Sequence, residues 1–212
     1  MFMITATRIR IPLELFYTIL VVLLAIQALF FERDNPGDRV IDTSQYSFTE
    51  APRQVLAAVL VVLPFGSLFV IFSARPATVF GEGFLDQLIT QAVFVSFVET
   101  VYMIVIVRTL WHENRNVGIL AWPVIFAFMH PVVRENWILL RFPLESFLGF
   151  AYAAVFGILF WILWEGRERL PRRYRGYFGA VTSWTAHLLI NLIVIAFPLT
   201  VFVLELFPLR WW

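Results

Sequence analysis

The chain has 212 residues and a net charge of +1, and 60% of its residues are hydrophobic while only 15% are charged. A soluble domain is nearer half apolar and about a quarter charged, so this composition excludes an ordinary soluble domain and indicates a membrane protein. The small net charge gives no case for a nucleic-acid partner. Cysteine is absent, which excludes disulfide bonds, thiol catalysis and cysteine-ligated metals.

Apolar stretches along the chain predict membrane-spanning helices. Lipid offers the backbone no hydrogen-bond partners, so a stretch that crosses it is expected to be a helix. The stretches lie at about 11–31, 54–73, 86–109, 117–133, 143–164 and 179–207. The last exceeds one straight crossing, and Pro198 is expected to kink it. The expected fold is an all-α, polytopic transmembrane helical bundle of about six spans.

The first apolar stretch follows Arg8 and Arg10 and superficially looks like a signal peptide. It is too long for the apolar part of a signal and lacks a small-residue cleavage site, so we expect a retained helix. The connector that follows, residues 32–53, is rich in charged and turn-forming residues. We expect it to be solvated and to carry no chemistry.

Arginine supplies all 16 basic residues, and its distribution predicts the topology. If the amino terminus lies on one side, the loops after the first, third and fifth spans lie on the other. These loops hold ten arginines: Arg33, Arg39, Arg53, Arg108, Arg115, Arg167, Arg169, Arg172, Arg173 and Arg175. The positive-inside rule places this side in the cytoplasm, in a multi-pass protein of the cell membrane. The five arginines of residues 167–175 are expected to anchor it to anionic headgroups.

Glu99 lies inside the third apolar stretch, at a depth where a charge is costly and usually functional. Arg108 is nine residues further along, roughly 14 Å of helix and about half a rotation away, so it is not an intrahelical partner. We therefore expect Glu99 to find its partner on another span or to remain protonated. A protonated structural carboxyl that hydrogen-bonds to another helix is the simpler alternative.

Two of the three histidines lie within or at the edge of apolar stretches. His130 follows Phe126 by four residues, and Asn191 follows His187 by four, so each pair shares one helical face. Measured from the arginine-rich ends of their spans, Glu99, His130 and His187 lie at depths of about 12–20 Å. The three side chains are therefore expected to converge in one layer of the membrane.

In chain order, these residues resemble three motifs of the CPBP intramembrane peptidases, the family that includes the CAAX proteases. The family motifs are EExxxR, FxxxH and HxxxN or HxxxD. At these places the chain has Glu99, then Phe126 to His130, then His187 to Asn191. The ordered set uses two of the only three histidines in the chain, which makes the resemblance moderately specific.

The first motif departs from the family pattern, because Thr100 replaces the second glutamate and Ile104 replaces the arginine. Glu99 keeps the first glutamate, the one that the family uses in catalysis. The resemblance covers about residues 84–196. It implies a division into two amino-terminal transmembrane helices with their polar connector, residues 1–83, and a CPBP-like catalytic core, residues 84–212.

The resemblance implies an endopeptidase that hydrolyses a peptide or membrane-protein substrate within the lipid bilayer, without a cofactor. Glu99 would act as general base on a water molecule that His130 helps to orient. His187 and Asn191 would donate hydrogen bonds to the oxyanion of the tetrahedral intermediate. The supporting residues would be Phe126 and Thr100.

Two alternatives stay open. Glu99, His130 and His187 form a set of the kind that binds zinc in soluble metallopeptidases, although the HExxH helix of those enzymes is absent. The chain could also be an inactive family homologue that acts as a membrane scaffold, assembly or transport protein. The departures at Thr100 and Ile104 favour this second alternative.

Overall fold

The computed structural model describes residues 2–3, 10–11, 13–40, 49–72, 88–129 and 144–196. These residues form an all-helical bundle, apart from two short strands, β1 (Phe2–Met3) and β2 (Arg10–Ile11), which pair antiparallel. The helices, in chain order, are α1 (Leu13–Asp34), α2 (Ala51–Phe72), η2 (Leu88–Val95), α4 (Ser96–Leu110), α5 (Arg115–Met129), α7 (Leu144–Arg169), α8 (Arg172–Arg175) and α9 (Ala180–Ala196). Residues 197–207 of the last predicted span, with Pro198, and residues 130–133 of the fourth lie outside the described residues.

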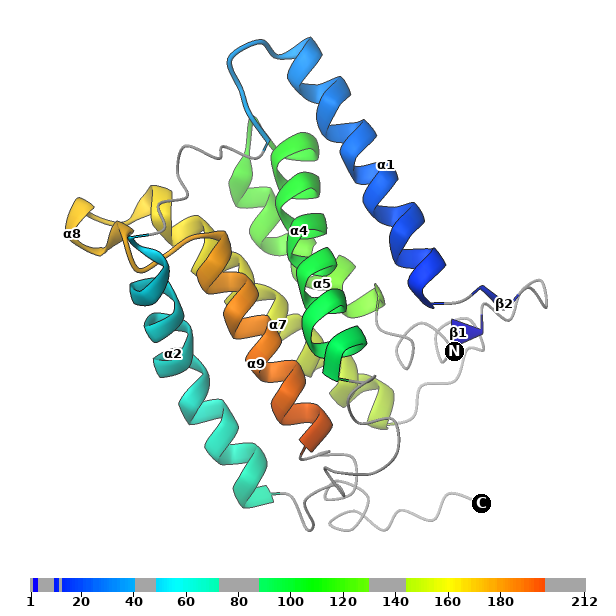
Figure 1. Cartoon of the computed structure of the whole chain (residues 1–212), viewed down its shortest axis with the longest axis vertical. Helices are drawn as coiled ribbons and strands as arrows, with labels where there is room; N and C mark the ends of the chain where they lie inside the picture. The colour runs from blue at the N-terminus through cyan, green and yellow to red at the C-terminus, as the bar shows by residue number, and fades with distance from the viewer. Residues whose placement is uncertain are drawn as a thin grey trace.

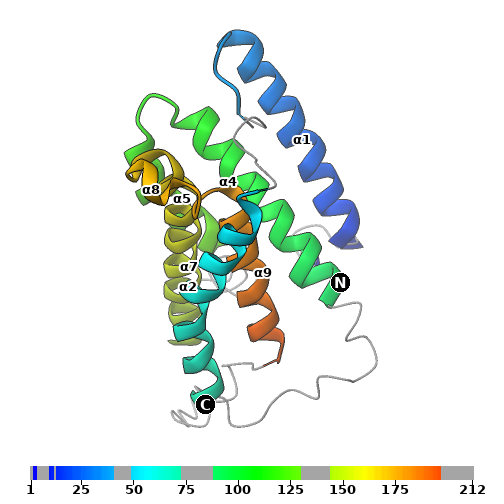
Figure 2. The same ribbon diagram turned by 60° about the vertical axis from the view of Figure 1, so that its left-hand side comes forward.

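The long helices alternate in direction, so that α1, α4 and α7 end where α2, α5 and α9 begin (Figures 1 and 2). We call this the polar end of the bundle; it comprises residues 33–40, 49–53, 108–116 and 167–180. Side chains tie its loops together: Arg167 Nη1 lies 2.6 Å from Glu50 Oε2, and Arg169 Nη1 donates to Asn116 Oδ1 over 2.9 Å. The three loops that the arginine count placed on one side therefore do lie together.

Two of the helices are long and apolar enough to cross a membrane: the continuous η2–α4 helix, Leu88–Leu110, and the Phe150–Arg169 part of α7. Shorter apolar helices lie at Ala51–Ser67, Asn116–Phe128 and Ala180–Ile195. Helices thus occur at each predicted span. The prediction that about six of them cross a bilayer stays a prediction.

The main core lies between α2, α4, α5, α7 and α9 and is rich in aromatic side chains, with Trp122, Phe126 and Phe160 among its buried members. Helices α5 and α7 approach closely at Gly157, where a Cβ atom would meet the Cα atom of Pro123 at 3.1 Å. A larger residue at this position would push α5 and its Phe126 ring away from α7.

Helix α1 lies at the edge of the bundle and packs against α4 (Figures 1 and 2). A small second cluster joins them, in which Leu24 contacts Val105 and Ile106. Gln27 Nε2 also donates to Thr109 Oγ1 over 2.6 Å. Since α1 adds no residue to the main core, the site described below is built by the other helices.

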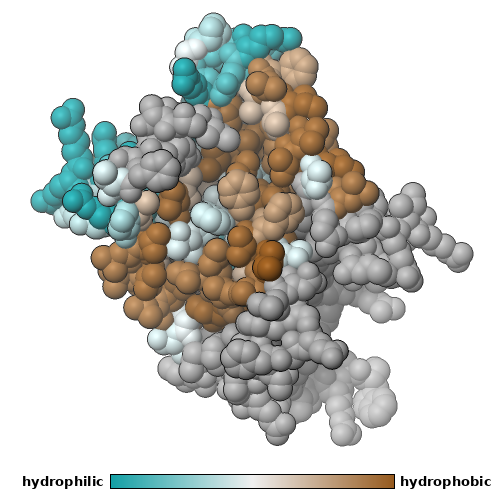
Figure 3. Space-filling view, in the orientation of Figure 1, coloured by the Kyte–Doolittle hydropathy of each residue, from teal (hydrophilic) through white to brown (hydrophobic). Residues whose placement is uncertain are grey.

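The outer surface of the bundle is apolar between its ends. Large hydrophobic side chains are exposed on α1, α2, η2–α4, α5 and α7, and Leu120 of α5 reaches 77% exposure. Figure 3 shows a broad hydrophobic face that gives way to hydrophilic residues at the tip of α1 and around α8. A soluble monomer rarely exposes contiguous apolar patches of this extent.

Candidate functional site

The Glu99 carboxylate meets the His187 imidazole inside the bundle, at the contact between α4 and α9. His187 Nε2 lies 3.2 Å from Glu99 Oε2, and the side chains are only 3% and 8% exposed respectively. The residues are 88 positions apart in the chain, so only the packing of the helices brings them together. Glu99 was expected to find its partner on another span or to remain protonated, and the structure gives it a partner on a separate helix.

Glu99 lies one turn after a change of helix type, from the π-helix η2 to the α-helix α4. Ser96 occupies the junction, where its hydroxyl donates to the carbonyl oxygens of Ala92 and Val93. Thr100 Oγ1 donates to the carbonyl oxygen of Ser96 over 2.8 Å. π-helical turns are frequent at functional sites, and these hydroxyls satisfy carbonyl groups of the preceding turn.

The bonding of Thr100 bears on its predicted supporting role. Its hydroxyl serves the backbone of its own helix, and its side chain is buried. Ile104, one turn further, is buried in the main apolar core. Thr100 and Ile104, which stand where the family motif has a second glutamate and an arginine, therefore contribute to the structure and packing of their helix.

Two aromatic rings from two further helices enclose the His187 imidazole. Phe160 of α7 stacks on it, with ring centroids 4.3 Å apart and 22° between the planes. Phe126 of α5 meets it edge-on at 5.6 Å and 71°. Phe126 was predicted to be a supporting residue on the same helical face as His130, and the structure places its ring against the other histidine, His187. The rings fix the plane of the imidazole, which holds Nε2 toward Glu99.

The remaining predicted site residues are only partly described. Asn191 lies on α9, one turn beyond His187, and is partly buried. His130 lies outside the described residues. The predicted convergence is thus observed for Glu99 and His187, with Phe126 beside them.

A second link between α4 and α9 lies next to this pair. Trp184 Nε1 donates to Ser96 Oγ over 3.2 Å, and the Phe97 ring meets the Trp184 ring edge-on at 5.9 Å. Sequence reasoning missed Trp184. The signal was available, because Ser96 and Trp184 lie three residues before Glu99 and His187, and a spacing of three places residues on one helical face.

Ser183 anchors the start of α9 against α7. Its hydroxyl is fully buried and donates to the carbonyl oxygen of Phe160 over 2.9 Å. Because Phe160 stacks on His187, this bond fixes the ring and the histidine relative to each other. The imidazole is therefore held by contacts that originate on three helices besides its own.

The described residues hold no group of three or more histidine, cysteine, aspartate or glutamate side chains that could bind a metal ion. The predicted zinc set includes His130, which is outside this part of the chain. What is observed is a carboxyl group and an imidazole in contact in a buried site, with aromatic rings beside the imidazole. Such a pair can pass a proton to and from a bound water or substrate.

The chain was compared with protein-family models, curated proteins and solved structures, and none of these comparisons found a match.

Proposed function

We propose that the protein is an integral, multi-pass membrane endopeptidase that uses Glu99 as the general base. The observation that carries the proposal is the buried contact of Glu99 with His187, whose imidazole packs against Phe126 and Phe160. Carboxyl and imidazole groups are the commonest general bases in enzymes. Burying them in an apolar helical interior costs free energy, and such groups are usually functional.

The location in a bilayer is supported by the surface of the bundle. Exposed leucine, isoleucine and valine side chains lie along α1, α2, η2–α4, α5 and α7, and on the face drawn in Figure 3 the hydrophilic residues gather at the tip of α1 and around α8. With α1, α2, η2–α4, α5, α7 and α9 all crossing, the polar end would face the cytoplasm by the arginine count. The buried pair would then lie within the hydrocarbon layer.

In the proposed reaction Glu99 takes a proton from a water molecule, whose oxygen attacks the carbonyl carbon of the scissile peptide bond. His187 and Asn191 donate hydrogen bonds to the resulting oxyanion, and His130 helps to orient the water. The C–N bond then breaks as the proton passes from Glu99 to the leaving nitrogen. The contact between His187 Nε2 and Glu99 Oε2 supports this scheme, because the base and an oxyanion donor act on adjacent atoms of the substrate.

A scaffold or assembly function is the second candidate, and a specific observation favours it. Thr100 and Ile104, the departures from the family motif, are engaged in helix packing. In this proposal Glu99 and His187 join α4 to α9 and perform no chemistry. The two proposals differ in the expected effect of removing the Glu99 carboxylate on peptide cleavage.

The test replaces Glu99 by Gln in the full-length protein in proteoliposomes. The substrates are synthetic peptides with an apolar anchoring segment, and the products are identified by mass spectrometry. Loss of a general base should lower the cleavage rate by about 10²–10⁴-fold. Glu165→Gln is the matched control, because Glu165 is equally buried but pairs with Arg169 near the polar end. Cleavage by Glu99→Gln at the wild-type rate, or no cleavage by the wild type, would overturn the peptidase proposal in favour of the scaffold.

A further inference from the structure

A basic surface on α8 has no carboxylate opposite it in the part of the chain that the structure describes. Its members, Arg172, Arg173 and Arg175, are all exposed, and no ion pair joins them to an acidic side chain among the described residues. We call these three residues the arginine surface. Its positive charge faces outward, where it is available to an anionic group.

The acidic residues near the arginine surface are already engaged with other arginines. Glu50 pairs with Arg167, and Glu168 pairs with Arg108. Glu165 pairs with Arg169 over 3.3 Å. These three carboxylates therefore neutralise Arg108, Arg167 and Arg169, and the positive charge of the arginine surface stays available to an external partner.

Tyrosines accompany the arginine surface at the edge of the apolar band. Tyr174 and Tyr177 are both exposed, and the Arg173 guanidinium lies 4.6 Å from the centroid of the Tyr174 ring. Tyrosine is enriched at the headgroup level of membranes, because its ring is apolar and its hydroxyl is polar. The mixture of arginine and tyrosine matches the headgroup layer better than open solvent.

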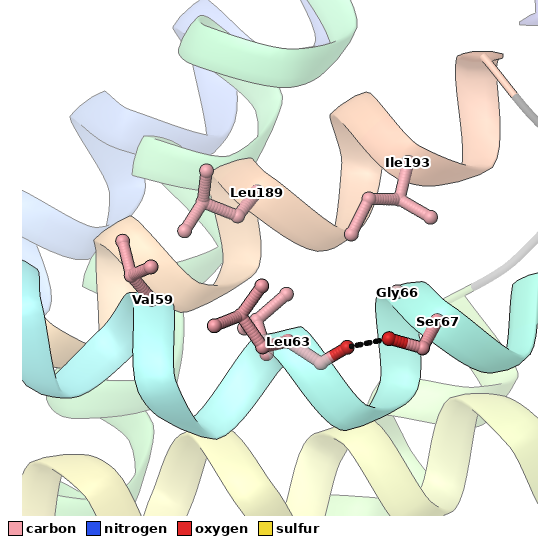
Figure 4. A pocket seen from close by; sticks show the side chains of 7 residues that line it. Val59, Leu63, Gly66, Ser67, Leu189 and Ile193 are labelled. Atoms are coloured by element: carbon pink, nitrogen blue, oxygen red, sulfur yellow. Dashed lines mark hydrogen bonds between the residues drawn. The ribbon is translucent and has the colours of Figure 1, made fainter. Parts of the chain in front are cut away.

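An apolar groove runs between α2 and α9 below this surface, with a volume of about 430 Å³ (Figure 4). Its lining residues are Val59, Val62, Leu63, Gly66, Ser67, Leu189 and Ile193. The single hydroxyl in the lining, that of Ser67, donates to the carbonyl oxygen of Leu63 over 2.9 Å. The groove thus offers an apolar surface to a chain-like ligand.

The arginine surface on α8 adjoins the beginning of both helices that line the groove, α2 and α9. Helix α8 leads into α9, and Gly176 beside it packs against Glu50, which immediately precedes α2. Val59 is nine residues beyond Glu50 and Ser67 is seventeen, which places the groove roughly 14–26 Å below the polar end. With a hydrocarbon core about 30 Å thick, this range begins in the inner part of the nearer leaflet, within reach of an acyl chain, and crosses the middle of the bilayer.

We propose that α8 and the α2–α9 groove together bind one anionic phospholipid. The arginine surface holds the headgroup phosphate, for which the planar guanidinium is well suited, and the groove holds an acyl chain. The proposal rests on the membrane location in the proposed function but not on peptidase activity. An anionic lipid is preferred to a zwitterionic one, because the latter carries its own cation beside the phosphate.

The test uses the purified full-length protein in a neutral detergent. Short-chain phosphatidylglycerol, phosphatidylcholine of the same chain length and glycerol phosphate are titrated separately, with bound ligand counted by native mass spectrometry. Phosphatidylglycerol should bind at least about tenfold more tightly than phosphatidylcholine, and Arg172→Gln with Arg173→Gln should abolish that preference. Arg175 is retained, because its Nε donates to the carbonyl oxygen of Leu170.

Two control variants separate the headgroup from the chain. Arg33→Gln with Arg39→Gln removes the same charge elsewhere at the polar end and should leave phosphatidylglycerol binding unchanged. Val59→Phe fills the groove and should weaken both lipids alike while leaving glycerol phosphate, which has no acyl chain, unaffected. Circular dichroism verifies that each variant is folded.

Equal affinity for the two lipids, or wild-type phosphatidylglycerol binding by the α8 variant, would overturn the proposal. Glycerol phosphate binding as tightly as the lipid would show a free-phosphate site and would also overturn it. Glu99→Gln should bind phosphatidylglycerol normally. Failure of the lipid site and failure of the peptidase proposal are thus observed in different experiments.

Discussion

The pair in the middle of the bundle and the pairs at the polar end use similar chemistry in different surroundings. Glu99 and His187 are 8% and 3% exposed, whereas Glu50 and Arg167 are 28% and 20% exposed. Water reaches the second pair and can solvate either partner when the other is lost. The comparison shows that burial, more than the kind of charged group, decides what removing one partner costs.

The two regions also differ in what surrounds the charged groups. In the middle pair, aromatic rings from α5 and α7 pack against the His187 imidazole. At the polar end, Arg108 Nη1 also donates to the carbonyl oxygen of Arg39, and Arg169 also donates to Asn116. Charged groups that share several polar partners near water tolerate the loss of one of them better than deeply buried groups do.

The largest expected effect follows from breaking the middle pair. His187→Leu leaves Glu99 without its imidazole in an apolar site and should lower the free energy of unfolding by about 3–5 kcal/mol. Unfolding in mixed micelles measures it. Adding Glu99→Leu should restore much of the loss, because neither charge then remains. A double variant as unstable as His187→Leu alone would contradict the attribution of this loss to the buried Glu99 carboxyl group.

The effect of depth in the bilayer can be measured by introducing an arginine at each of two exposed apolar positions in turn. Val155 lies in the middle of α7, and Leu110 is the last residue of α4 at the polar end. Val155→Arg should disfavour membrane insertion by about 2.5–3.5 kcal/mol. Leu110→Arg should change insertion little, since its guanidinium reaches the surface. A glycosylation-site insertion assay measures both, and equal effects would count against the proposed bilayer location.

The Trp184–Ser96 bond allows a smaller change next to the middle pair. Trp184→Phe keeps an aromatic ring against Phe97 but removes the donor to Ser96 Oγ. The loss should be about 1 kcal/mol in the same micelle assay. Ser96→Ala should cost more, because it also removes the bonds to the carbonyl oxygens of Ala92 and Val93. Adding Trp184→Phe to Ser96→Ala should cost little more, because the bond between the two residues is already lost. Fully additive losses would show that the bond does not contribute.

The smallest effect is expected at the polar end. Arg167→Gln should lower the free energy of unfolding by at most about 1 kcal/mol, and less as salt is raised. Glu50→Gln should behave alike. A loss as large as that of His187→Leu would show that the polar end is less accessible to water than its exposure indicates.

Hydropathy and residue spacing in the sequence were enough to predict where the helices lie. They also predicted that Glu99 has no charged partner on its own helix. These are local properties, because a helix of given length has a fixed rise and rotation per residue. The grouping of the arginine-rich loops at one end also followed from the sequence, since consecutive helices alternate in direction.

Only the tertiary structure decided which side chains meet. Spacing along one helix cannot say which face of another helix it contacts, because that depends on how all the helices pack. Packing gave Glu99 the imidazole of His187 and placed Phe126 against that ring. The sequence alone therefore determined the helices and the need for a partner, and the packing of separate helices chose the partner.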